Sequence, residues 1–366
     1  MESIRRNDIG KNVRIFVVVT VISFGFMFVI YGTYVSSFKM LSERFGYSNS
    51  TKFSVNGLEH LEMERKAQFP GHAKTPKMKV PAVWTYAPSE MRESGGACEE
   101  MDKIVVNADF VKSFIRNIPI FIHNPRRDYI SSQINSNHDH EPHIFNIISS
   151  FLAKDRDMNL IDIGANIGVI SLKAAMFGRK VISVEAAVSN VQHICASANI
   201  NRVTKRITVI HNAISDNHTS VTFVMGKDGE FGGSFMDDGN FRDYKTRKSG
   251  VKFDTQNLVT IKTIILDDLL LLPNINDFKS VFIKMDIEGS EHKALLGAKK
   301  LFRMINVRGV LMEWRWHVER PESKSIILEF MEENGFEPYA LAKLAKKKLD
   351  GKTMRDSDVL WLPKSL

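Results

Sequence analysis

Short apolar runs alternate with helical patterns through the central and C-terminal parts of the chain, and one run organises the others. Residues 160–163 are apolar except for Asp162. A turn that contains Gly164 and Gly168 follows, and apolar residues with helical spacing continue over 169–177. This pattern predicts a buried strand, a tight glycine turn and a helix.

The same alternation repeats toward the C-terminus. Further strands are predicted at 119–123, 180–184, 207–210, 221–225, 259–265, 281–285, 309–313, 336–341 and 359–362. Helices are predicted at 143–152, 188–199, 267–271, 290–301 and 323–334. Strands that alternate with helices indicate a parallel α/β sheet, here ending in an antiparallel pair. Residues 226–250 are rich in glycine and charge, which suggests an exposed hairpin or lid.

The N-terminal part has a different pattern, because residues 15–38 contain no charged side chain. Such a run is long enough to cross a bilayer as one helix, which needs about 20 residues. Positive charge is heavier before the run than after it, so the N-terminus is predicted to be cytosolic and the C-terminal bulk lumenal. A buried core helix is the alternative interpretation.

These patterns predict four segments: a cytosolic tail at 1–14, a transmembrane signal anchor at 15–38, a stem at 39–102 and a folded domain at 103–366. We therefore expect a single-pass type II membrane protein of the Golgi or ER, with its main domain in the lumen. The N-x-S/T sequons at Asn49 and Asn217 agree with this orientation.

Composition and charge limit the classes of ligand and partner that the chain is expected to bind. The formal net charge of +8 is modest, and basic residues do not interleave with aromatic ones, so no nucleic acid is expected. Cys98 and Cys195 lack metal-site spacing, and whether they pair as a disulfide is left open. Residues 138–143 contain histidines and acids without a standard ligand spacing. We predict no metal there and interpret the run as a polar loop at the substrate mouth.

Candidate chemistry begins at the glycine turn, whose sequence over 162–168 is D-x-G-A-N-x-G. A dinucleotide fingerprint requires glycine where this chain has Asn166 and Val169. The turn instead resembles motif I of class I S-adenosylmethionine (SAM) methyltransferases, where it faces the methionine part of the cofactor. A turn without a ligand is the alternative. The resemblance marks as cofactor-binding residues Asp162, Gly164, Ala165, Asn166 and Gly168.

Polar residues also follow the next two strands. Glu185 ends the strand after the turn, about 20 residues on, where a carboxylate accepts hydrogen bonds from ribose hydroxyls. A surface or helix-capping role is the alternative for it. Asn212 and Ala213 follow the third strand, and in class I methyltransferases the corresponding loop lies beside the adenine.

Three ionisable residues, Lys284, Asp286 and Glu288, stand at alternate positions where an apolar strand ends. Charges there are costly unless they are paired or used, and ligands of open α/β sheets bind at the carboxyl ends of strands. We predict Asp286 as a catalytic base that also contacts the cofactor, with Lys284 as a catalytic residue that orients it. A lysine–carboxylate pair beside a helix cap is the alternative.

His317 is the third candidate catalytic residue, because it follows a strand that ends in Glu313. Its unperturbed pKa near 6.5 suits a general base. A hydrogen-bonded histidine at the rim of the site fits the sequence equally well, and Glu313 is a second candidate for an orienting residue.

Taken together, the strings IDIGANIG, HNAIS, TIILDDLL, KMDIEGSE and LMEW resemble the FkbM family of SAM-dependent methyltransferases over about residues 121–363. The resemblance implies a Rossmann-like, seven-stranded class I methyltransferase sheet, here preceded by a transmembrane helix and a stem. It also implies SAM as cofactor and O-methylation of a hydroxyl. Family motifs carry over to Asp162, Gly164, Asn166, Gly168, Glu185, Asp286 and Glu288.

The sequence therefore predicts a SAM-dependent O-methyltransferase in the secretory-pathway lumen. Its acceptor is expected to be a hydroxyl of a glycan, a lipid or a small molecule. Two alternatives stay open: a membrane-tethered SAM-binding protein without turnover, and an NAD(P)-dependent reductase, which the missing glycines disfavour.

Overall fold

The computed structural model describes residues 81–94, 98, 110–224, 235–237, 259–341, 348–350, 354–355 and 357–364. The predicted anchor at 15–38, the sequon at Asn49 and most of the predicted lid lie outside these residues and stay predictions. No helix in the described ranges has the length and apolar character needed to span a bilayer.

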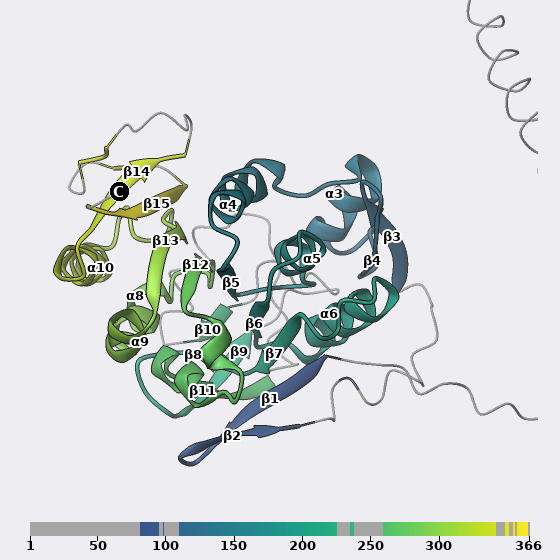
Figure 1. Cartoon of the computed structure of the whole chain (residues 1–366), viewed down its shortest axis with the longest axis horizontal. Helices are drawn as coiled ribbons and strands as arrows, with labels where there is room; N and C mark the ends of the chain where they lie inside the picture. Colours follow the sequence, from purple (N-terminus) through teal and green to yellow (C-terminus); the bar gives the residue numbers. More distant parts are fainter. Residues whose placement is uncertain are drawn as a thin grey trace, which may run out of the picture. The chain divides into compact units, whose positions relative to one another are not determined.

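A nine-stranded sheet forms the centre of the described structure (Figure 1). Its strands, in spatial order, are β14 (Phe336–Ala340), β15 (Asp358–Pro363), β13 (Asn306–Glu313), β12 (Ser280–Met285), β5 (Met158–Ile163), β6 (Val181–Glu185), β7 (Ile207–His211), β1 (Ala82–Ala87) and β2 (Glu90–Glu93). The pairs from β13 through β12, β5, β6 and β7 to β1 are parallel, and β14, β15 and β2 join antiparallel.

The prediction of seven strands is wrong in number. Seven neighbouring strands, from β14 to β7, arise where the sequence predicts them, with the antiparallel pair at the end. Two more come from residues that the sequence assigned to the stem: β1 pairs with β7 over Ala82–Trp84, and β2 folds back on β1. Buried Val83 covers the edge of the sheet, which explains why this segment is not a linker.

Helices cover both faces of the sheet (Figure 1). Alternate side chains of a strand point to opposite faces, and Leu160 of β5 joins one apolar cluster whereas Ile161 joins the other. The first cluster includes side chains of α4 (Pro142–Lys154), α5 (Val169–Met176) and α6 (Val188–Ile200). The second includes α8 (Glu291–Leu296), α9 (Lys299–Met304) and α10 (Pro321–Glu333).

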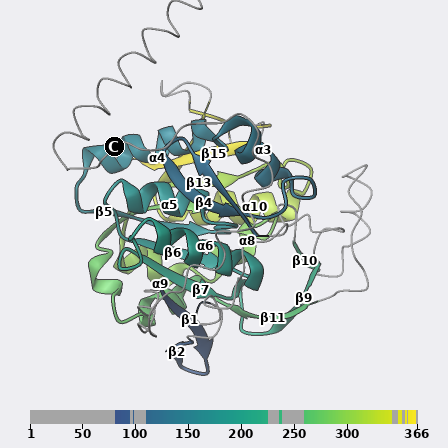
Figure 2. The same cartoon turned by 90° about the vertical axis from the view of Figure 1, so that its right-hand side faces the viewer.

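Smaller elements lie outside this main sheet. Strands β8 (Ala213–Ile214), β9 (Ser220–Val224), β10 (Phe235–Asp237) and β11 (Val259–Ile264) form a second sheet, and Figure 2 shows β9, β10 and β11 grouped together. The predicted edge strand at 119–123 is β4 (Ile118–Ile122), which forms a hairpin with β3 (Val111–Ile115) that precedes α3 (Tyr129–Asn137). The short helix predicted at 267–271 is the 3-10 helix η5 (Leu266–Leu271).

The single helix predicted at 290–301 is divided into α8 and α9. Gly297 ends α8, and a Cβ atom at that position would lie 2.8 Å from the Ile265 side chain. The close approach of Ile265 therefore requires glycine, and the chain turns before α9 begins at Lys299. Periodicity alone does not reveal such a break, because apolar spacing continues across it.

Cys98 and Cys195 form a disulfide, which the sequence left open. Their Cα atoms are 5.9 Å apart, and both residues are buried. The bond attaches Cys98 to α6, which packs on the sheet through Val191 and Ile194. The two cysteines are 97 positions apart in the sequence, so the cross-link restricts a long stretch of the unfolded chain.

We expect reduction of this disulfide to lower the free energy of unfolding by about 2–4 kcal/mol, because a long loop is released in the unfolded state. Urea denaturation with and without reductant measures the difference. The double variant C98S/C195S is the control, since its stability should be low and insensitive to reductant. Equal stability of the oxidised and reduced wild-type protein would contradict the prediction.

Candidate functional site

The glycine turn after β5 lies directly against the end of β12. Gly164 and Gly168 have φ angles of +76° and +84°, which favour glycine. A Cβ atom on Gly164 would lie 1.9 Å from the backbone oxygen of Asp286. The predicted cofactor turn and the predicted acidic strand end therefore meet, because the two neighbouring parallel strands finish at the same edge.

Every backbone N–H group of the turn is bonded within the protein. Gly164 and Ala165 both donate to Val184, Gly168 donates to Ala165, and Ile167 donates to the side-chain oxygen of Asn166. The N–H of Asn166 donates to Glu185 over 2.8 Å. No backbone N–H group of residues 164–168 is left for a pyrophosphate, which argues against a dinucleotide in this turn.

Glu185 connects the turn to the start of α6. Its Oε2 accepts the hydrogen bond from Asn166, and its Oε1 accepts one from the N–H of Ala187 and one from the amide of Asn190. Burial raises the pKa of Glu185 above its ordinary value, although these bonds oppose the rise. A carboxylate oxygen accepts two hydrogen bonds, so Oε2 retains capacity for a ligand hydroxyl, as the ribose interpretation requires.

Asp162 is fully buried, so its side chain supports the turn from inside instead of contacting a ligand. Its Oδ2 accepts a hydrogen bond of 2.6 Å from the hydroxyl of Ser171 in α5. Its Oδ1 has no hydrogen-bond partner and lies 3.6 Å from Nζ of Lys284. The predicted direct contact with the cofactor is corrected here to a structural contribution.

Lys284 is a buried cation that connects three parts of the site. Its Nζ donates to the backbone oxygen of Gly164 over 3.0 Å and lies 3.3 Å from Oδ2 of Asp286. Burial by itself lowers the pKa of Lys284, but Asp286 and Asp162 outweigh it and hold the pKa above the ordinary value. Lys284 therefore stays protonated, and its predicted catalytic role becomes one of positioning.

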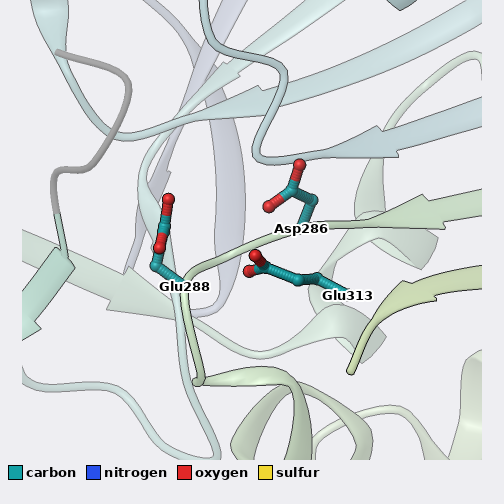
Figure 3. Close-up of side chains that lie close together, drawn as sticks. All are labelled: Asp286, Glu288 and Glu313. Carbon is teal, nitrogen blue, oxygen red and sulfur yellow. The ribbon is translucent and has the colours of Figure 1, made fainter. Parts of the chain in front are cut away.

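Asp286, Glu288 and Glu313 form a group of carboxylates at the ends of β12 and β13. One oxygen of each lies within 4.8 Å of the others, and Figure 3 shows the carboxyl groups of Asp286 and Glu313 facing one another. Lys284 pairs with Asp286, and Arg315 pairs with Glu313. These cations already balance part of the negative charge, and we assign no metal to the group.

The two facing carboxyl groups titrate differently. Burial raises the pKa of Glu313 well above its ordinary value, and the charges of Asp286 and Glu288 add to this. Burial also raises the pKa of Asp286, but Lys284 outweighs it and the net pKa is lowered. Asp286 is therefore the ionised member of the pair, and its side chain is 34% exposed.

His317 does not have the geometry of a general base, so that prediction is wrong. Its side chain is fully buried, and its Nε2 forms a 2.7 Å hydrogen bond with Glu291. Its Nδ1 forms one of 2.8 Å with Ser323. Both ring nitrogens are thus used to join α8 to α10, which is the hydrogen-bonded alternative that the sequence left open.

Asn212 and Ala213 also have structural contacts. The Asn212 side chain accepts hydrogen bonds from Thr85 and from the N–H of Tyr86, and it donates to the backbone oxygen of Lys262. Ala213 is buried and pairs with Thr263 in β11. These bonds attach β1 and β11 to the end of β7, and the adenine interpretation of Asn212 gains no support from them.

The structure adds His140 and Glu141 to the site. They precede α4, which runs into β5, so the N-terminus of α4 lies at the carboxyl edge of the sheet. Burial lowers the pKa of His140 to about 4, with Lys284 contributing, and burial raises the pKa of Glu141, with Asp286 contributing. The sequence signal was the polar loop at 138–143, which was expected at the substrate mouth without a role for either residue.

Comparison with known families gives an independent result. Residues 162–338, slightly less than half of the chain, match the family described as methyltransferase FkbM domain. This match confirms the predicted enzyme class, a methyltransferase, and with it the predicted cofactor, SAM. The match begins at Asp162 and includes Glu185, Asp286 and Glu313. None of the curated proteins compared with the chain is significantly similar to it in sequence.

Solved structures resemble the chain only weakly. A precorrin-6Y C5,15-methyltransferase from Geobacter metallireducens is 14% identical, with 61% of this chain and 88% of that one covered and a TM-score of 0.32. A putative O-methyltransferase from Klebsiella pneumoniae is 12% identical, with 62% and 82% covered and a TM-score of 0.34. A magnesium protoporphyrin IX methyltransferase from Synechocystis is 9% identical, with 64% and 84% covered and a TM-score of 0.33. We draw no argument from likenesses of this size.

We expect Lys284→Met to lower the free energy of unfolding by about 3–5 kcal/mol, because it leaves the buried carboxylate of Asp162 without a counter-charge. Chemical denaturation at neutral pH measures the loss. The double variant D162N/K284M is the matched control and should regain part of the stability. If the single and double variants were equally unstable, the ion pair would not be the cause.

Proposed function

We propose that this methyltransferase, whose residues 162–338 carry the FkbM domain, transfers the methyl group of SAM to a hydroxyl oxygen of an acceptor in the lumen of the secretory pathway. The observation that carries the proposal is the meeting of three predicted groups at one sheet edge. Gly164 packs against Asp286, and Glu185 holds the N–H of Asn166 in the same turn.

The residues at this edge fit the chemistry of SAM. SAM has a ribose diol and a positively charged sulfonium, and when bound it supplies an electrophilic methyl group. Ionised carboxylates accept hydrogen bonds from a diol, which suits Oε2 of Glu185. Asp286 offers a partly exposed negative charge beside the turn. Gly164 keeps the turn close to β12, where a side chain would not fit.

Holding the acceptor oxygen in line with the methyl group is the main task of the protein, because the donor is already activated. Alignment of two reactants at about 3 Å supplies much of the acceleration in such reactions. Lys284 fixes the ends of β5 and β12 relative to each other through Gly164 and Asp286. Because these strand ends are fixed, the edge can hold the two reactants in alignment better than a loosely ordered edge would.

Three features support a lumenal location. The two cysteines of the chain are paired, and disulfides persist in oxidising compartments such as the ER lumen. Asn217 of the second sequon is exposed at a bend between β8 and β9, where a glycan can be attached. The uncharged run at 15–38 supplies a candidate anchor, so we propose a type II membrane protein of the Golgi or ER.

The direct test incubates the full-length protein, in detergent, with methyl-labelled SAM and with fractionated glycans, lipids and small molecules from cells. Label in a hydroxyl-containing fraction supports the proposal. SAM binding without transfer to any fraction would favour the alternative of a tethered binding protein. Label on nitrogen or carbon would keep the enzyme class and remove the assignment to hydroxyl acceptors.

We expect Glu185→Ala to weaken SAM binding by about 10-fold or more, since one hydrogen bond to a charged group is worth about 1.5–3 kcal/mol. Titration calorimetry with SAM measures the change. Glu322→Ala, at an exposed position in the first turn of α10, is the control and should bind normally. Unchanged affinity of the Glu185 variant would remove the ribose interpretation.

We expect endoglycosidase treatment of protein made in secretory cells to increase its gel mobility. Asn217→Gln should abolish one step of that shift, because Asn217 is exposed. Gel electrophoresis of treated and untreated samples gives the result. An unshifted wild-type protein, with both sequons intact, would contradict the lumenal location.

A further inference from the structure

We propose that His140 is the general base that accepts the proton of the acceptor hydroxyl, with Glu141 beside it on the acceptor side of the site. The proposal deepens the proposed function and rests on it. Four observations carry it: the position of the turn before α4, the contacts that hold this turn, the unused ring nitrogens of His140, and the engagement of the other candidate bases.

Topology places His140 at the reacting edge. Helix α4 ends at Lys154 and β5 begins at Met158, so the helix runs back along the sheet before the strand starts. The helix N-terminus therefore lies at the end where β5 turns through Gly164. Residues of α4 share an apolar cluster with β5 and β12, which keeps this orientation fixed.

Contacts from α5 hold the turn in place. Lys173 of α5 pairs with Asp139 and donates to the backbone oxygen of His140 over 3.3 Å. The N–H of Arg116 donates to the backbone oxygen of His138 over 2.8 Å. Glu141 adopts a left-handed conformation with φ of 44° and starts α4 at Pro142. These contacts fix the backbone that carries the imidazole, which suits a residue that must face a reacting atom.

Both ring nitrogens of His140 keep their hydrogen-bonding capacity. Nδ1 is buried without a hydrogen-bond partner, and Nε2 lies 3.9 Å from a carboxylate oxygen of Glu141, beyond hydrogen-bonding distance. The His140 side chain is 14% exposed and Nδ1 is its buried nitrogen, so Nε2 is the nitrogen that an incoming hydroxyl reaches. Buried polar groups are normally bonded, so an imidazole left unbonded at this edge points to a ligand.

The other candidate bases at this edge are engaged. Asp286 is paired with Lys284, and Glu313 is buried and accepts the indole N–H of Trp316 over 2.8 Å. His317 uses both ring nitrogens inside the protein. Of these candidates, His140 is therefore the one that has a ring nitrogen without a hydrogen-bond partner.

Its surroundings keep His140 neutral before the reaction. Burial lowers its pKa to about 4, and Lys284 and Lys173 act in the same direction, whereas Asp286 and Asp128 oppose them. The ring is therefore unprotonated near pH 7 and can accept a proton. A base of low pKa is sufficient, because the hydroxyl becomes strongly acidic as its oxygen acquires the methyl group.

The proton and electrons balance in one step. The acceptor oxygen forms its bond to the methyl carbon while the carbon–sulfur bond breaks and its electron pair stays on sulfur. The hydroxyl proton passes to Nε2 of His140 as the new bond forms. Glu141 and Asp286 then stabilise the imidazolium, which releases the proton to water.

The test compares His140→Ala with wild-type, full-length protein in the labelled-SAM assay on the fraction that wild type methylates. We expect kcat to fall about 100-fold or more, the usual contribution of a general base, with SAM affinity unchanged. Added imidazole should restore transfer in the variant. Glu322→Ala, at an exposed position in the first turn of α10 and outside the site, is the control and should retain full transfer.

Each result decides the question. Loss of transfer with intact SAM binding and rescue by imidazole supports His140 as the base, and the absence of any one of these overturns it. Normal transfer by the His140 variant, with loss in Asp286→Asn, would return the role to Asp286. If wild type methylates no fraction, the proposed function fails first, which separates that outcome from failure of this inference.

Discussion

The buried ammonium of Lys284 is the interaction on which the arrangement of the site depends. It lies between a fully buried carboxylate, Asp162, and a partly exposed one, Asp286, and it bonds the backbone of Gly164. A charge in such a place is costly unless partners surround it, and here each partner comes from a strand end or turn that must meet the others. The ion pair therefore fixes the relative positions of β5 and β12.

Around this pair, two other contacts complete the carboxyl edge of the sheet. Glu185 closes the glycine turn from the β6 side by accepting the N–H of Asn166. The turn before α4, whose residue His140 accepts a hydrogen bond from Lys173, also lies at this edge. Because the backbone N–H groups of the turn are bonded within the protein, this edge presents the carboxylates of Glu185 and Asp286 to a ligand and no free backbone donor of the turn. That character suits a cofactor with a diol and a positive charge better than one with a pyrophosphate.

Several charged side chains that a motif would mark as catalytic instead maintain this structure. Asp162 and Lys284 neutralise one another inside the sheet, and Glu291 joins His317 in the layer of α8 and α10. Asn212 holds the added strand β1 at the sheet edge. The same motifs thus contain residues that support the site and residues that contact a ligand. The degree of burial of each side chain distinguishes the two groups.

The sequence alone determined the seven neighbouring strands from β14 to β7, the glycine turn and the acids at strand ends. Period-two and helical apolar patterns depend on local geometry, and the positive φ angle at Gly164 favours glycine for a local reason. Only the tertiary structure decided which groups are exposed, because burial depends on elements far apart in the chain. It buried His317, paired Cys98 with Cys195, added β1 and β2 to the sheet and brought His140 within the electrostatic influence of Asp286. These outcomes follow from contacts across the chain, which no local pattern encodes.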